Sequence, residues 1–73
     1  MDFTEATDRL TKSVSLADLA RELEASYGLI RQARMDPTSP SYRRPPVGWE
    51  DAVARLAEAR AKELLALKEA LNK

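Results

Sequence analysis

The sequence predicts an all-α fold of four helices, the last of them much longer than the others. Apolar residues recur at intervals of three and four through most of the chain, which is the helical period. No segment of useful length alternates apolar and polar residues as a half-buried strand would. All four prolines fall within residues 36–48, so the one long loop is confined to that stretch. With 73 residues the chain forms a single domain.

The first two helices are expected over residues 3–12 and 16–24. In the first, Phe3, Ala6 and Leu10 share a face, and Asp2 can cap the start. Ser15 is suited to cap the second helix. The apolar stripe of this second helix comprises Leu16, Leu19, Ala20 and Leu23.

The third helix is expected over residues 27–35, with Ser26 as its cap and with Ile30 and Ala33 facing inward. Pro37 ends it, because a proline disfavours helical geometry in the residue before it. Residues 1–48 therefore comprise three helices and a Pro/Arg loop.

The fourth helix is expected over residues 49–71, within a closing segment that runs to residue 73. At 1.5 Å per residue such a helix is about 35 Å long. A compact domain of this size has a diameter of roughly 29 Å, so the second half of the helix is expected to overhang the core. An exposed apolar stripe indicates a partner helix, and a homodimer is the simplest case. The expected dimer interface comprises Ala61, Leu64, Leu65, Leu67 and Leu71.

The charge is polarised along the chain although the net charge is zero. Residues 1–24 carry three basic and six acidic side chains, a net charge of −3. Residues 25–44 carry four arginines and one aspartate, a net charge of +3, and residues 45–73 are neutral. A local basic patch of this kind, rather than the overall isoelectric point, forms an electrostatic footprint on nucleic acid.

Several function classes are disfavoured by composition. The chain has no cysteine and no histidine, which removes the commonest metal ligands and the commonest general base. We therefore expect no enzyme activity, no metal, no cofactor and no small-molecule ligand. No run of about 18 apolar residues is present and the N-terminus does not resemble a signal peptide, so we expect no membrane association and a cytoplasmic, nucleoid-associated location.

The spacing of apolar residues across positions 15–34 is that of a helix-turn-helix unit. It resembles the Cro and phage-repressor class of DNA-binding proteins. The pattern is carried by Leu19, Leu23, Ala25, Ile30 and Ala33 at its apolar positions and by Ala20 at its small position. The chain departs from the pattern at Glu24, where glycine is usual because the backbone adopts a positive φ.

A helix-turn-helix unit implies that the third helix enters the major groove of duplex DNA. The expected base contacts are Tyr27, Arg31, Gln32 and Arg34, with Gly28 allowing close approach. The expected phosphate contacts are Ser15, Ser26, Arg43 and Arg44. The resulting hypothesis is a small homodimeric transcriptional repressor or autoregulator, of bacterial or phage type, that binds an inverted-repeat operator.

Two alternatives remain open at this point. One is a DNA-packaging or recombination accessory, similar to a small terminase subunit, in which higher oligomers are usual. The other is a helical protein-interaction module without a DNA role, in which the 15–34 segment is an ordinary helical hairpin.

Overall fold

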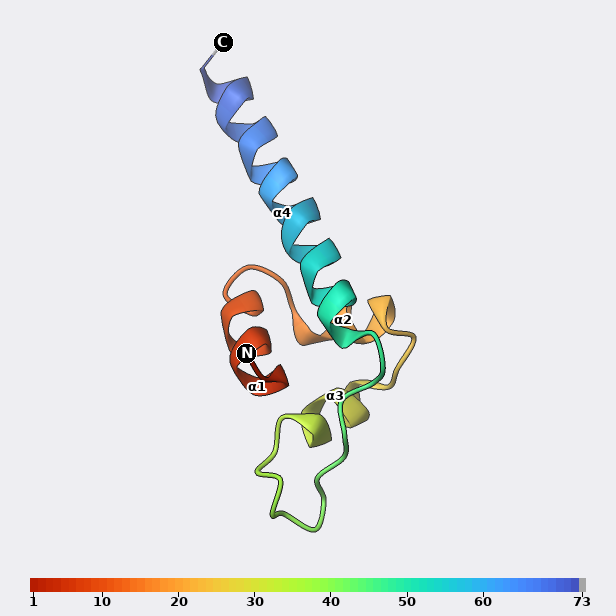
Figure 1. Ribbon diagram of the computed structural model, residues 1–73. Helices are drawn as coiled ribbons and strands as arrows, with labels where there is room; N and C mark the ends of the chain where they lie inside the picture. The colour runs from red at the N-terminus through yellow and green to blue at the C-terminus, as the bar shows by residue number, and fades with distance from the viewer. Residues whose placement is uncertain (73) are drawn as a thin grey trace.

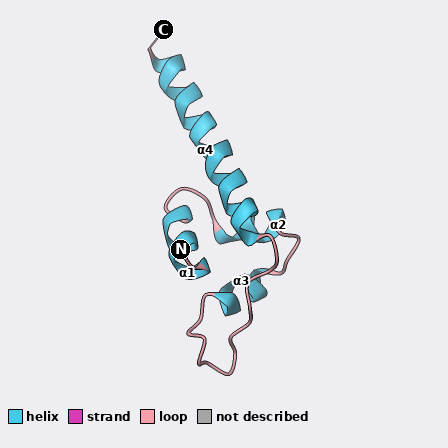
Figure 2. Cartoon of the chain, viewed as in Figure 1, coloured by secondary structure: helices cyan, strands magenta, loops and turns pink. Residues whose placement is uncertain are grey.

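The computed structural model describes residues 1–72, and these form four α-helices joined by turns and one long loop (Figures 1 and 2). Helix α1 spans Phe3–Leu10, α2 spans Leu16–Glu22, α3 spans Tyr27–Ala33 and α4 spans Trp49–Leu71. No strand occurs within the described residues. The predicted all-α class is confirmed, although each of the first three helices ends two residues earlier than expected. Lys73, at the end of the expected closing segment, lies outside the described residues.

Each of the first three helices begins at the polar residue that the sequence predicts as its cap. In each case the N–H of the third helical residue donates to a side-chain oxygen three residues earlier, at 2.8–3.1 Å. These pairs are Glu5–Asp2, Asp18–Ser15 and Leu29–Ser26. Such a bond satisfies an N–H group that has no partner within the helix and contributes about 1 kcal/mol. Short helices such as these depend on such caps and on packing.

Helices α2 and α3 pack on each other across a turn in which Glu24 adopts a left-handed conformation, with a φ of 54°. The Ala25 N–H donates to the Ala20 carbonyl at 2.9 Å and closes the end of α2. Position 24 is where the sequence pattern expects glycine, and the positive φ is the reason. A residue with a Cβ loses roughly 1–2 kcal/mol of stability in the left-handed conformation, and the packing of the two helices offsets this loss.

The core lies where the four helices meet. Its buried members are Phe3, Leu10, Val14, Leu19, Ala20, Ile30, Ala33 and Ala52. The Trp49 ring meets the Phe3 ring edge to face, with centroids 5.3 Å apart, and this contact joins α4 to α1. An ion pair of 2.8 Å between Arg55 and Glu22 joins α4 to α2.

The first half of α4 packs on the core through Trp49, Val53 and Leu56. Ala52 is fully buried there, whereas Ala57 is exposed. Ala52 is the one residue of α4 that is fully buried, and its small side chain suits that position. The helix begins after Gly48, whose φ of 86° favours a residue without a Cβ.

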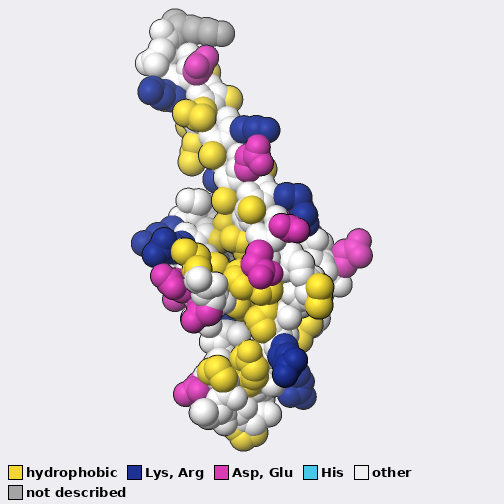
Figure 3. Space-filling model, in the orientation of Figure 1, with side chains coloured by type: hydrophobic (Ala, Val, Ile, Leu, Met, Phe, Trp, Pro, Cys, Tyr) yellow, Lys and Arg dark blue, Asp and Glu magenta, His cyan; other side chains and the backbone are white. Residues whose placement is uncertain are grey.

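The second half of α4 projects beyond the globular part of the molecule, as the sequence predicts (Figure 1). The molecule extends 54 × 20 × 17 Å along its principal axes. We call residues 61–71 the stalk. Its four leucines, Leu64, Leu65, Leu67 and Leu71, are 52%, 61%, 55% and 75% exposed. Hydrophobic side chains accordingly line the stalk in Figure 3. No helix among the described residues is both long and apolar enough to cross a membrane.

Candidate nucleic-acid interface

Helix α3 turns one face to the core and the opposite face to solvent. Ile30 and Ala33 are buried against the other helices. Successive residues advance by about 100° around a helix, so Gly28 and Gln32 lie opposite Ile30. Arg31 lies beside them and is exposed, whereas Gln32 is half-buried. The outward face of α3 therefore presents a bare stretch of backbone at Gly28 between two side chains that can donate hydrogen bonds.

A shallow groove of ≈ 470 Å³ runs between this face and the loop that follows. We call it the α3 groove. It is lined by Ser26, Gly28, Leu29, Arg31, Gln32, Met35 and Ser41. Leu29, Met35 and Ser41 fall outside the sequence-based expectation for the interface. Met35 is 42% exposed and follows Arg31 by four residues, which is about one helical turn. Helical periodicity alone therefore predicts that Met35 lies on the same side as Arg31. Ser41 reaches the groove only through the path of the loop, which the sequence does not specify.

The loop is held against α3 by its backbone. The Arg43 N–H donates to the Gln32 carbonyl at 3.4 Å and brings the returning part of the loop beside the helix. At the other end, the Asp36 carboxylate accepts bonds of 2.9 Å from both the N–H and the hydroxyl of Thr38. These bonds, the N–H first, hold the pKa of Asp36 below its usual value. Val47, by contrast, is fully exposed and anchors nothing.

Arg34 does not join the outward face, contrary to the expectation. It follows Ile30 by four residues, so it lies on the same side of the helix one turn later. Its guanidinium is paired with Asp8 of α1, and its side chain is only 26% exposed. Its Nε is buried and has no hydrogen-bond partner among the described residues. The structure therefore places Arg34 as a link between α1 and α3 rather than beside Arg31.

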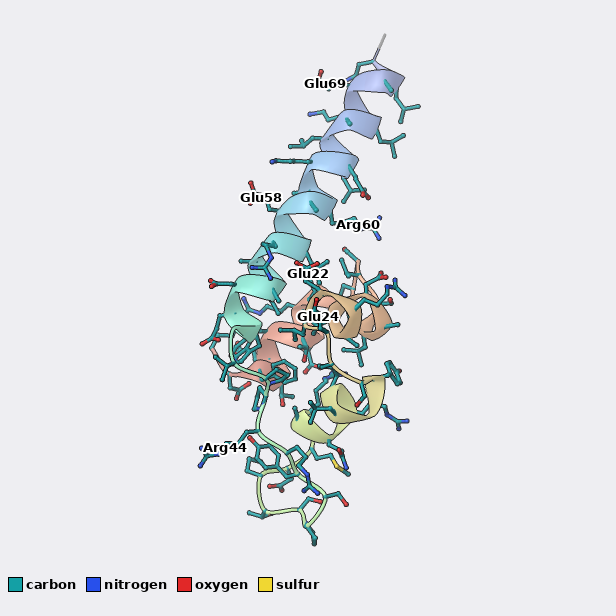
Figure 4. All side chains as sticks on the ribbon, turned by 90° about the vertical axis from the view of Figure 1, so that its right-hand side faces the viewer. Glu22, Glu24, Arg44, Glu58, Arg60 and Glu69 are labelled. Atoms are coloured by element: carbon teal, nitrogen blue, oxygen red, sulfur yellow. The ribbon has the colours of Figure 1, made fainter. Side chains whose placement is uncertain are left out.

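The remaining expected contacts surround the α3 groove to different degrees. Tyr27 opens the helix and is 49% exposed. The Ser15 and Ser26 hydroxyls accept the cap bonds described above, which leaves each O–H free to donate to an anion. Arg43 donates from Nη1 to the Tyr42 carbonyl at 3.0 Å. Arg44 projects from the loop into solvent, away from the α3 ribbon in the view of Figure 4.

Gly28 has open space around it. A Cβ built there meets only the Ser26 hydroxyl, at 4.0 Å. Close packing of α2 against this position is therefore not the reason for a glycine within α3. The remaining explanations are tolerance near a helix end and the approach of a partner from outside.

The described residues contain no candidate metal centre, and no known family is matched. Among residues 1–72 no three acidic side chains are grouped so that they could hold a metal ion. No protein-family model, curated protein or solved structure matches the chain.

Proposed function

We propose that this chain binds duplex DNA sequence-specifically as a small transcriptional repressor or autoregulator. In this proposal α2, the turn at Glu24 and α3 act as a helix-turn-helix unit, and α3 enters the major groove. The observation that carries the proposal is the outward face of α3, where Arg31 and Gln32 flank the bare backbone at Gly28. Arginine can bond guanine and glutamine can bond adenine through two hydrogen bonds each, and such a pair contributes about 1–3 kcal/mol of base discrimination.

The electrostatics support the same surface. Because Arg34 is paired with Asp8, the cations that remain in the α3–loop segment are Arg31, Arg43 and Arg44. Arg43 and Arg44 lie on the loop that flanks α3, which is where the phosphates bordering the groove would pass. The Ser26 O–H, whose oxygen already accepts the cap bond, can donate to a phosphate as well. We assign base contacts to α3 and phosphate contacts to its flanks.

Selection from a randomised duplex pool at about 150 mM salt tests this proposal, because sequence-independent binding is weakened at that ionic strength. We expect enrichment of an inverted repeat whose half-sites are roughly 34 Å apart, one helical turn of DNA. With about eight phosphate contacts in a dimeric complex, the logarithm of the affinity should fall with the logarithm of salt at a slope near −7. If no sequence is enriched, the proposed function is wrong.

Gly28→Ala distinguishes a glycine required by DNA from a merely tolerated one. In the free protein the variant should be more stable by up to about 1 kcal/mol, because alanine favours a helix more than glycine does. On DNA the added methyl group should cost about 1–3 kcal/mol of binding free energy through overpacking. Chemical denaturation and fluorescence anisotropy with the selected duplex measure the two effects. Unchanged DNA affinity in a stabilised variant would remove the close-approach role of Gly28.

A further inference from the structure

Met35 lies on the outward face of α3, just after the helix ends. Its N–H donates to the Gln32 carbonyl at 3.2 Å, so the chain continues to turn in the helical sense beyond Ala33. Met35 follows Gly28 by seven residues, which is close to two full turns, and so it lies on the same side as Gly28. Both residues also line the α3 groove. Periodicity and the groove therefore agree in placing Met35 on the face turned away from the core.

The Met35 side chain is open to a partner that approaches this face. It is 42% exposed, whereas Leu29, the other large apolar residue of the α3 groove, is half-buried. The neighbouring Arg34 is paired with Asp8 of α1, which leaves this end of the outward face to Met35. The stalk lies toward the opposite end of the molecule from α3 and so does not cover the face (Figure 1).

A single exposed apolar side chain is ordinary on a protein surface, and what distinguishes Met35 is its neighbours. Arg31 and Gln32 precede it by four and three residues, about one turn, and line the α3 groove with it. The face therefore presents a cation and an amide, followed by an apolar group. The major groove of DNA offers hydrogen-bonding groups on every base pair, but an apolar group only on thymine, as its C5-methyl.

We propose that Met35 contacts the C5-methyl group of a thymine in the major groove and adds a preference for thymine to the bases that Arg31 and Gln32 contact. Such a contact rests on the proposed function and adds to its specificity. The methionine side chain is unbranched and polarisable, so it adapts to a methyl group without a fixed geometry. The contact removes apolar surface of both groups from water, which favours thymine over a base without the methyl group.

The spacing along α3 indicates where this thymine lies in the bound sequence. Arg31 and Met35 are four residues apart, which corresponds to about 6 Å along the helix axis. Successive base pairs are about 3.4 Å apart, so this separation spans about two base pairs. The selected sequence should therefore contain a thymine, on either strand, within about two base pairs of the position at which Arg31→Ala loses its base preference.

Replacement of thymine by uracil tests the contact, because it removes the C5-methyl group and leaves the hydrogen-bonding groups of the base pair unchanged. Each thymine of the selected duplex is replaced in turn by deoxyuridine, and fluorescence anisotropy measures the affinity of the unmodified chain. We expect one position in each half-site to lose about fourfold in affinity, the effect of one buried methyl group. If uracil is tolerated at every position, the proposal is wrong.

Variants of Met35 then assign the methyl group to this side chain. Met35→Ala should bind the thymine duplex about fourfold more weakly for each half-site. It should bind the uracil duplex as the unmodified chain does, because the group that Met35 contacts is already absent. Met35→Leu keeps an apolar side chain of similar volume and should retain the preference for thymine over uracil.

Val47→Ala is the control, since it trims a fully exposed apolar side chain that does not line the α3 groove. We expect it to bind both duplexes as the unmodified chain does. Equal losses of Met35→Ala on the thymine and uracil duplexes would show that Met35 does not recognise the methyl group, and they overturn the proposal.

These measurements separate the role of Met35 from the proposed function. A chain that enriches no DNA sequence overturns both. A chain that enriches a sequence and loses affinity in Arg31→Ala, but tolerates uracil at every position, supports the proposed function and overturns the role of Met35 alone.

Discussion

Leu19→Ala is expected to lower the free energy of unfolding by about 2–5 kcal/mol. Leu19 is fully buried in the core where α2 meets the other helices. Its removal loses apolar burial and leaves a cavity that the short helices can close only in part. A domain of this length has a total stability on the order of 5 kcal/mol, so a loss at the upper end of this range would leave about half of the molecules unfolded at room temperature.

Leu65→Ala is the matched control, since it makes the same substitution on the stalk. Leu65 is 61% exposed on the stalk. We expect its effect to stay within about 0.5 kcal/mol, the range for surface substitutions. Urea denaturation followed by circular dichroism measures both variants. If the two lost equal stability, the assignment of Leu19 to the core and of Leu65 to solvent would be wrong.

The helix starts were predictable because their signals are local. Asp2, Ser15 and Ser26 each stand immediately before an apolar period, and each accepts the expected cap bond. The helix ends were less predictable, because they depend on where the chain turns to pack. The left-handed turn at Glu24 falls where the sequence pattern places it, but α2 already ends at Glu22, two residues before the expected end.

The candidate interface was predictable in part. Arg31 is exposed on the outward face of α3, and Gly28 and Gln32 lie opposite buried Ile30. Arg34 was misplaced although helical periodicity sets it one turn after buried Ile30, on the same side of α3. Its pairing with Asp8 joins residues 26 positions apart, and no local pattern reveals that partner. Ser41 was missed for a related reason, because the bond between Arg43 and Gln32 decides how the loop returns to α3. Long-range contacts therefore reshape the site that periodicity outlines.

Arg31→Ala is expected to produce the largest loss of DNA affinity among single side-chain truncations on α3. Arg31 is the exposed cation on the outward face of the helix, and no ion pair among the described residues restrains it. Loss of a bidentate contact to guanine costs about 1–3 kcal/mol, which is roughly 5- to 150-fold in affinity for each half-site. Preference for one base pair in each half-site should be lost at the same time.

Arg9→Ala is the control for charge alone. Arg9 lies on α1, is 66% exposed and pairs with Glu5 at 3.1 Å, so its removal changes net charge without touching the α3 groove. Fluorescence anisotropy with the selected duplex and with a scrambled duplex distinguishes the two roles. A base-reading Arg31 loses affinity mainly for the selected duplex, whereas a phosphate-binding one weakens both duplexes alike. If Arg31→Ala and Arg9→Ala bind the selected duplex equally well, α3 does not read bases, and the proposed function loses the observation that carries it.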